Sequence, residues 1–368
     1  MAKYIVRRVL EAIPVIWLIS IASFLLMQAA PGGPQAAFNQ NPHITPQQVD
    51  AWLASWCLER QPDAVGYVRE YLGWLGVWNC TGGGFLSASG VPNFLPGFLG
   101  GGTNGVLHGD FGFSLFSGLP VLSMIAQRLP ATAILMVTAW IGWVSIALVA
   151  GVLAAVKRYS VFDQTVTFLS YFFLSMPTFW LGLILIFLFG VELRWFPAQG
   201  IVNVRTSPAP FGTDAYWAAF FRNPLPNILD IASHLVLPVV TLIAISIAGD
   251  SRFVRSAMLE SLTQDYVRTA KAKGLPARTV IFRHALRNAL LPILTNIALE
   301  IAFLFSGAIA TETVFSWPGM GNLFYVGINE RDYFLLMGIL LIASCFVVFM
   351  NIVADVLYVW ADPRIRFD

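Results

Sequence analysis

The sequence has few charged residues. Lys, Arg, Asp and Glu make up 11% of its 368 residues, whereas hydrophobic residues make up 57% and the mean hydropathy is +0.70. These values lie far outside the range of soluble globular domains and indicate a protein of the lipid bilayer. The net charge of +2 is too small to indicate nucleic acid binding, so the positions of the charges along the chain carry more information.

Motifs for nucleotide, metal and nucleophile chemistry are also missing. The sequence contains no G-x-x-x-x-G-K-[ST] phosphate loop, no H-E-x-x-H and no G-x-S-x-G elbow. Its four histidines are scattered and no C-x-x-C occurs, which argues against a metal site. We therefore expect no catalytic activity, cofactor or metal site in this chain.

Six apolar segments approach the roughly 20 residues that a helix needs to cross a bilayer core of about 30 Å. They are residues 12–30, 131–156, 164–190, 230–250, 288–311 and 333–354. The first is long and is followed by no clear small-residue cleavage site, which favours a retained span over a signal peptide. Pro177 interrupts the third segment, and Glu300 lies inside the fifth. The expected fold is an all-α polytopic membrane protein with six transmembrane helices.

The distribution of Lys and Arg orients these spans, because basic residues stay on the cytoplasmic side. Six spans put both termini on one side of the membrane. Cytoplasmic termini assign fifteen basic residues to the cytoplasm and seven to the other side. We therefore expect both termini in the cytoplasm, a cytoplasmic connection at 252–287 and a large extracytoplasmic connection at 31–128.

The extracytoplasmic connection begins with two expected helices. Thr45, Pro46 and Gln48 form a capped helix start that predicts a helix to about Leu58, and a second helix is expected over 63–75. Ten of the 28 residues between Gly82 and Gly109 are Gly, which predicts a long loop.

Cys57 and Cys80 both fall in this connection, on the side where disulfides persist, and Cys345 falls in the last span. A Cys57–Cys80 disulfide and two unrelated thiols both fit the sequence. Pairing would close a segment of about 23 residues and contribute about 3 kcal/mol by the chain-entropy model.

The cytoplasmic connection contains the sequence Y-V-R-T-A-K-A-K-G-L-P. We expect a helix over 257–273 that ends at Gly274, then Leu275, and a second helix that starts at Pro276. Gly is common just after a helix end and Pro is common at a helix start, so this sequence indicates a turn between two helices. Such a turn would make a compact knob joined stiffly to the fourth and fifth spans. A basic loop that serves only the orientation rule, or that contacts anionic lipid, is the alternative.

A resemblance bears on this choice. A-K-A-K-G followed by a helix and L-L-P is similar to the cytoplasmic coupling loop of binding-protein-dependent ABC importer permeases, and D-Y-V-R-T-A-K-A-K-G resembles the variant of the dipeptide, oligopeptide and nickel subfamily. The general pattern, Glu-Ala-Ala, three residues, then Gly, is met only at Ala270 and Gly274, because Arg268 and Thr269 depart from it. Further similar segments are Y-I-V-R-R-V-L, A-P-G-G-P, G-D-F-G-F-S, R-L-P-A-T, S-M-P-T-F-W, F-S-W-P-G-M-G and D-P-R-I-R. Residues 76–105 match no part of the family pattern.

The resemblance implies a type I importer permease with an insertion between helices 1 and 2. Its parts would be residues 1–30, an extracytoplasmic loop domain at 31–128 and a five-helix core at 129–368 with the coupling loop at about 251–289. It implies a second permease subunit, two ATPase subunits that bind ATP and Mg²⁺, and an extracytoplasmic binding protein. The implied coupling residues are Arg268, Thr269, Ala270, Lys271, Ala272, Lys273, Gly274, Leu275 and Pro276. We expect Ala270 and Leu275 to enter a groove of the partner ATPase.

Peptides are the leading substrate class that the resemblance implies, and nickel or glycans stay open. An ion-gradient-driven carrier or a channel is the alternative function, although no convincing repeat of the kind typical of such carriers occurs. Glu300 lies near the middle of a span, where an ionised side chain costs roughly 2.5 to 3.5 kcal/mol. We expect Glu300 and Asn296 to line the substrate pathway, and a protonated Glu300 hydrogen-bonded between helices is the alternative.

Overall fold

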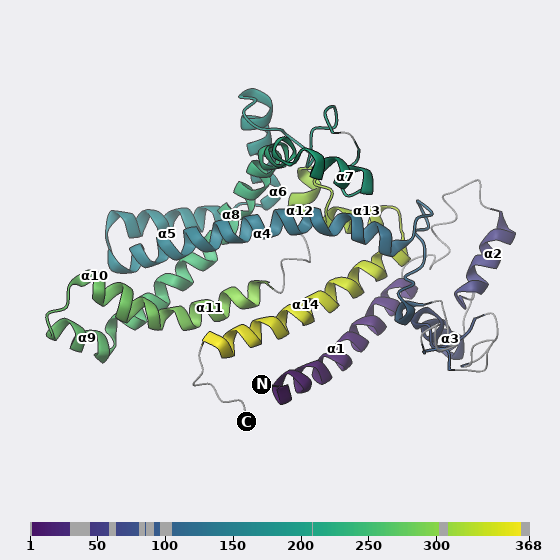
Figure 1. Ribbon diagram of the computed structural model, residues 1–368, viewed down its shortest axis with the longest axis horizontal. Coiled ribbons are helices and arrows are strands. Elements are labelled where there is room, and N and C mark those ends of the chain that lie inside the picture. The colour runs from purple at the N-terminus through teal and green to yellow at the C-terminus, as the bar shows by residue number, and fades with distance from the viewer. Residues whose placement is uncertain are drawn as a thin grey trace. The chain divides into compact units, whose positions relative to one another are not determined.

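The computed structural model describes residues 2–29, 45–58, 64–80, 85, 92–95, 105–207, 209–301 and 308–361. These residues are largely helical, and their β-structure is confined to isolated bridges such as Phe113–Pro120. Four helices among them are long and apolar enough to cross a membrane (Figure 1). These spans are Val6–Ala29, Val121–Val156, Pro224–Thr263 and Tyr333–Asp355, and a bent pair, Val161–Leu174 with Thr178–Glu192, makes a fifth if it is counted as one span.

The bent pair corresponds to the expected third span. α5 (Val161–Leu174) and α6 (Thr178–Leu185) meet at an angle of 101°. Pro177, in an extended conformation at φ −61° and ψ 131°, caps α6, and its ring and missing N–H prevent a continuous helix. A π-helix, η4 (Ile186–Glu192), continues α6. The interruption that Pro177 predicts is therefore a sharp bend.

The fourth span is longer than expected. α8 (Pro224–Thr263) is one helix of 40 residues that runs through Asp230, Pro238 and Asp250, so charged residues do not mark its ends. Pro224 suits the first turn because that position needs no N–H donor. The expected fifth span begins with α11 (Arg287–Ile301), and α12 (Ile309–Val314) follows, but residues 302–307 lie outside the described part of the chain.

The chain divides into two compact units, and each is described by itself. The first unit comprises Met1–Val9, Gln127–Asn322 and Phe346–Asp368, and the second comprises Leu10–Ala126 and Leu323–Cys345. The long helices α1 (Ala2–Ala29), α4 (Val121–Val156) and α14 (Tyr333–Ala361) each contribute to both units. Most of the segment expected as an extracytoplasmic loop domain, residues 31–126, falls in the second unit together with parts of these helices.

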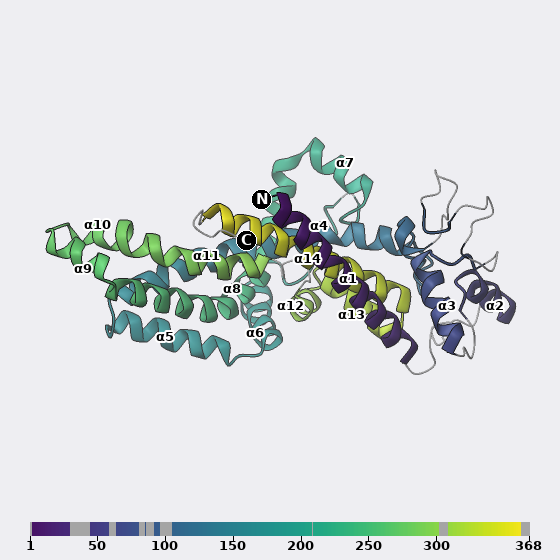
Figure 2. The same cartoon turned by 90° about the horizontal axis from the view of Figure 1, so that it is seen from below.

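In the first unit, α8 packs along α5 and α11. The short helices α9 (Asp265–Ala272) and α10 (Ala277–Thr279) lie together at the end of α8 and α11 that is remote from α6, α7 (Asp214–Arg222) and α12 (Figures 1 and 2). Gly151 lets α4 approach α8 closely, because an added Cβ would lie 2.6 Å from the Ser251 carbonyl oxygen.

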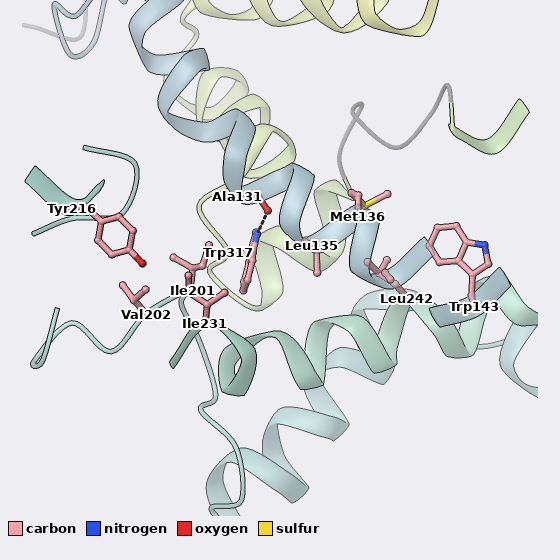
Figure 3. Packing of buried hydrophobic residues seen from close by; sticks show 11 residues of the cluster. Ala131, Leu135, Met136, Trp143, Ile201, Val202, Tyr216, Ile231, Leu242 and Trp317 are labelled. Carbon is pink, nitrogen blue, oxygen red and sulfur yellow. Dashed lines mark hydrogen bonds between the residues drawn. The ribbon is translucent and has the colours of Figure 1, made fainter. Parts of the chain in front are cut away.

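An apolar core in this unit joins α4 to residues 201–202, α7, α8 and the segment after α12 (Figure 3). Its buried members include Ala131, Leu135, Met136, Ala139, Trp143, Ile201, Val202, Tyr216, Ile231, Leu242 and Trp317. Trp317 is fully buried, and its Nε1–H donates to the Ala131 carbonyl oxygen at 2.8 Å. The indole therefore fills the core without leaving its polar atom unpaired.

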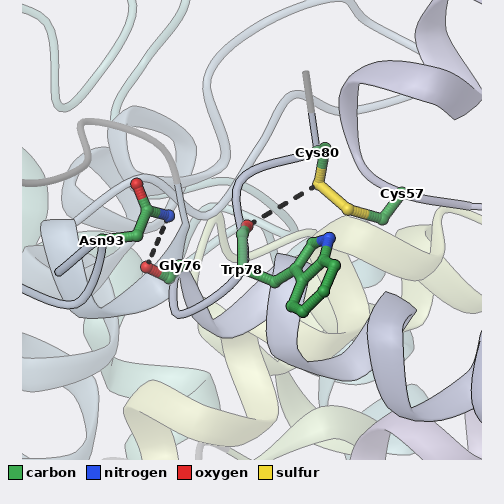
Figure 4. Close-up of a disulfide and its surroundings, with 5 residues drawn as sticks. All are labelled: Cys57, Gly76, Trp78, Cys80 and Asn93. Carbon is green, nitrogen blue, oxygen red and sulfur yellow. Dashed lines mark hydrogen bonds between the residues drawn. A yellow bond between two sulfur atoms is a disulfide. The ribbon is translucent and has the colours of Figure 1, made fainter. Parts of the chain in front are cut away.

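In the second unit, the two helices expected early in the outer connection are present as α2 (Pro46–Ser55) and α3 (Ala64–Leu75). The structure joins Cys57 to Cys80 in a disulfide (Figure 4). Gly73 leaves room for it, because a Cβ there would lie 2.7 Å from the Cys57 sulfur. Most of the Gly-rich run lies outside the described residues, and its last part contains a short 3-10 helix, η3 (Val106–His108).

The last span of the second unit starts at a buried carboxyl group. The Asp332 carboxylate accepts from the Leu335 N–H at 3.3 Å and from the Ser114 hydroxyl at 2.5 Å. Asp332 thus caps α14, which follows α13 (Met320–Asn329), and ties it to the segment before α4. Burial raises the pKa of the Asp332 carboxyl, and the Ser114 hydrogen bond opposes that shift.

Candidate functional site

The connection between α8 and α11 makes two turns. α8 ends at Thr263, Gln264 is extended at ψ 153°, and α9 begins at Asp265, so the single helix expected over 257–273 is wrong. α9 ends at Ala272, and Gly274, two residues beyond that end, has a φ of +73° and an N–H that donates to the Lys271 carbonyl oxygen at 2.9 Å. This left-handed position explains the Gly, because other residues are strained there.

Apolar side chains fix α9 to the rest of the first unit. Val267 and Ala270 are buried, at 0% and 4% exposed, in a core shared with α4, α8, α11 and the π-helix η5 (Val280–Leu286). The other buried members of that core are Val152, Ala155, Val254, Met258, Val280, Ala285, Ala289 and Ile293. The connection is therefore a packed extension of the long helices.

Ser261 adds polar contacts at the end of α8. Its hydroxyl donates to the Ala285 carbonyl oxygen at 2.7 Å and is 2.7 Å from the Tyr266 hydroxyl oxygen. These contacts link α8, α9 and η5 at one buried point. A force applied to α9 would be transmitted directly to α8 and α11.

The side of this connection that faces away from the core is exposed. Arg268, Thr269, Lys271, Ala272, Lys273, Gly274, Leu275 and Pro276 are all exposed. Ala270 is the exception, so the expectation that it enters a partner groove is wrong: its side chain fills the core of this chain instead. Phe282, at 58% exposed, is an apolar residue of the same connection that the sequence analysis missed.

A second cluster lies between α4, α8 and α11 of the first unit. The Asn296 side-chain amide donates to the Glu300 carboxylate at 2.9 Å and lies 3.4 Å from an Asp250 carboxylate oxygen. The Trp143 Nε1–H reaches the other Glu300 oxygen at 3.4 Å. The structure thus brings together the two predicted pathway residues and adds Asp250, which the sequence analysis treated as the end of a span.

The F-S-W-P-G-M-G segment surrounds a buried carboxylate. Glu312 is 0% exposed; its carboxylate accepts from the Thr132 hydroxyl at 3.1 Å and from the Asn322 N–H at 2.9 Å. The Thr132 oxygen also accepts from the Met320 N–H at 2.7 Å. A Cβ on Gly319 would lie 2.5 Å from Glu312, so the segment needs Gly at that position. These contacts give the R-L-P-A-T and F-S-W-P-G-M-G segments a structural role.

Asp163 and Arg255 form a bidentate ion pair between α5 and α8. The Arg255 Nε–H and an Arg255 Nη2–H donate to the two Asp163 carboxylate oxygens at 2.6 and 2.8 Å. Asp163 also accepts from the Tyr159 N–H at 2.9 Å. Bidentate geometry makes this pair directional, so α5 is held to α8 in one register.

Metal-binding chemistry is not evident in the part of the chain that the structure describes. Within the described ranges no three His, Cys, Asp or Glu side chains gather as a metal site would require.

Comparison with known proteins finds a family of transport proteins and several full-length relatives. Residues 147–367 match the family described as binding-protein-dependent transport system inner membrane component. The chain is 37% identical to the oligopeptide transport system permease protein AppB of Bacillus subtilis over the full length of both chains. It is also 35% identical to the di/tripeptide transport system permease protein DppB of Pseudomonas aeruginosa and 34% identical to the dipeptide transport system permease protein DppB of Escherichia coli, covering all of this chain and 99% of each relative.

Proposed function

Because this chain belongs to the family of binding-protein-dependent transport system inner membrane components, we propose that it is the permease subunit of an ATP-driven importer that moves peptides inward. The peptide substrate is inferred from the names of its full-length relatives. The observation that carries the proposal is the exposed connection around Gly274, which is backed by a continuous core that reaches α4, α8 and α11. An ion-gradient-driven carrier does not require a surface that binds an ATPase.

The importer would contain this chain, a second similar permease subunit, two cytoplasmic ATPase subunits and an extracytoplasmic binding protein. ATP and Mg²⁺ would bind to the ATPase subunits. One ATPase would hold the exposed side of residues 268–276, with Ala270 supporting that surface from within. When the ATPases close, α9 would move as a rigid body with α8 and α11 and open the pathway toward one side of the membrane.

We propose six spans with both termini in the cytoplasm. In the first unit the Arg8 Nε lies 2.9 Å from an Asp355 carboxylate oxygen, which puts the start of α1 beside the end of α14. The Cys57–Cys80 disulfide suits an oxidising compartment, as expected for an extracytoplasmic segment. Intact mass after alkylation, with and without reductant, tests this point: two alkylated thiols at these positions under non-reducing conditions would contradict it.

We further propose that Glu300 and Asn296 line the substrate pathway, together with Asp250. All three are partly exposed in the single chain, so a second permease subunit could enclose them with a substrate. Glu300→Gln should reduce uptake of cationic peptides more than uptake of neutral peptides. Equal retention of both would assign Glu300 to the alternative role of a hydrogen-bonded group between helices.

Co-purification and uptake test the proposed function together. The tagged chain, purified from its native membrane, should retain an ATPase at one copy per permease subunit. After reconstitution in liposomes, peptide uptake should require both ATP and the binding protein. Uptake driven by an ion gradient without ATP would overturn the proposal.

A further inference from the structure

A cavity of about 600 Å³ opens in the first unit, beside the apolar core of Figure 3. Gln127 and Arg128 from α4 and Ser316 from the segment after α12 line it together with apolar residues that include Ile201, Val202 and Phe211. Figure 3 shows Ile201 and Val202 near Tyr216 and Trp317, so a packed wall closes one side. This volume is typical of a site for a small molecule. It is too small to hold a docking segment of another protein.

The chemistry of this cavity favours an anion. Among the described residues of its lining, Arg128 is the one that is charged, and no Asp or Glu occurs there. Within the described ranges, the Arg128 guanidinium makes no hydrogen bond or ion pair, and the acid that attracts it from nearby is Glu312. Glu312 is itself fully buried and accepts from Thr132 and Asn322.

Two neutral groups of the lining complement Arg128. The side chains of Gln127 and Ser316 are exposed, and neither makes a hydrogen bond within the described residues. The cavity is thus lined by a half-buried guanidinium, an amide and a hydroxyl, which together are a set of donors that suits a carboxylate.

We propose that this cavity is a subsite for the terminal carboxylate of a peptide substrate, bound by Arg128. The inference rests on the proposed function, since the terminal carboxylate is a group that peptides of different sequence share. By the topology proposed above, Arg128 lies at the extracytoplasmic end of α4, where a substrate arrives from the binding protein. Gln127 and Ser316 would orient the carboxylate, and the apolar wall would accept the last side chain.

The test compares two probes in liposomes that contain the complete importer: alanyl-alanine and alanyl-alanine amide, which differ in the terminal charge. Arg128→Gln should lower kcat/KM for the acid about tenfold relative to the amide, because it removes a charge-assisted hydrogen bond. The binding protein's own preference for acid or amide is the same with the unmodified permease and with Arg128→Gln. It therefore cancels when the acid-to-amide ratio of kcat/KM for one importer is divided by that for the other. Arg222→Gln, an exposed arginine of α7 that does not line the cavity, should leave this ratio unchanged.

Arg128→Lys keeps the charge but loses the bidentate geometry, so it should keep part of the preference for the acid. If the importer does not assemble with Arg128→Gln, the same uptake comparison is made with Arg128→Lys. The proposal is overturned if Arg128→Gln changes acid and amide uptake equally, or if Arg222→Gln has the same effect. An effect of Arg128→Gln that appears only in anionic vesicles, is absent in phosphatidylcholine and is equal for the acid and the amide would assign the cavity to a lipid headgroup and also overturn the proposal. Absence of peptide uptake by the unmodified importer would instead contradict the proposed function.

Discussion

The connection between α9 and α10 and the connection between α12 and α13 both turn through a left-handed residue, Gly274 at φ +73° and Ser316 at φ +50°. The first is supported by apolar side chains beneath it and leaves its outer face open, since a Cβ on Gly274 would meet nothing within 4 Å. The second surrounds the buried Glu312 carboxylate, so its contacts face inward.

This difference separates two kinds of turn. Hydrogen bonds around Glu312 and the indole of Trp317 hold the second connection in place, so its geometry is determined even at a strained non-Gly residue. Around Gly274 the described residues show backbone hydrogen bonds, such as Gly274 N–H to the Lys271 carbonyl oxygen at 2.9 Å, and no buried side-chain network of that kind. The exposed face of this first connection is the surface proposed to bind an ATPase. Changes in the second connection should therefore affect folding, whereas changes on the exposed side of the first should affect coupling.

The largest effect should come from Glu312→Ala. It leaves the Thr132 hydroxyl and the Asn322 N–H without their acceptor in a buried site, at a cost of about 3 kcal/mol in the free energy of unfolding. The thermal midpoint of the purified chain in detergent, followed by size-exclusion chromatography after heating, measures it. Glu260→Ala, at an exposed position on α8, is the matched control and should change stability by about 0.5 kcal/mol or less. Equal midpoints for the two variants would show that Glu312 does not hold its connection together.

Ala270→Leu should have the next largest effect. Three additional carbon atoms at a position that is 4% exposed would overfill the core beneath α9, at a cost of about 1–3 kcal/mol. The exposed neighbour Ala272 gives the control, because Ala272→Leu adds the same atoms without overfilling a core. The same heating assay compares them, and equal stability of both variants would contradict the packing of α9 described above.

Ser316→Gly should leave stability nearly unchanged or raise it slightly. Gly relieves the strain of the left-handed conformation, about 1 kcal/mol, while its greater freedom in the unfolded chain offsets part of that gain. A clear fall in the thermal midpoint would mean that the Ser316 side chain stabilises the turn, and the contrast with Gly274 would then be weaker.

Lys271→Ala should have little effect on ATPase association. Its side chain is exposed, and exposed ion pairs contribute about 0 to 1 kcal/mol, so ATPase association should weaken less than about fivefold. Pull-down of the ATPase at graded concentrations measures this change. A complete loss of association would show that charge, not the shape of the connection, dominates binding.

Local chemistry made some of these features predictable. Gly followed by Leu and Pro predicts a helix end and a turn, and Gly274 has the expected left-handed conformation. The apolar side of residues 63–75 predicts a helix, and α3 spans Ala64–Leu75. In both cases the residues that determine the structure lie within about ten positions of one another. Helix propensity and hydrophobic periodicity can be read over such short segments.

Other features depend on contacts between distant segments. Ala270 is small and weakly apolar, so its burial with Val267 becomes evident only when α9 packs on α8 and η5. Asp250 resembled a span end because charged residues are rare within spans, but α8 continues beyond it and places it beside Asn296. The Glu312 contacts with Thr132 join residues 180 positions apart, a distance at which a single sequence carries no pairing signal.

Reconstitution of Gly274→Val and Gly274→Asn side by side tests the central claim that the turn at Gly274 presents the coupling surface. The β-branched Val strains a left-handed backbone by about 1–2 kcal/mol, whereas Asn tolerates it better. Membrane insertion should be normal for both. Gly274→Val should lower peptide uptake per ATP hydrolysed by about tenfold, or lose the ATPase in proportion, and Gly274→Asn should keep most of the activity. Normal coupled uptake by Gly274→Val, with the ATPase bound at full stoichiometry, would contradict the account.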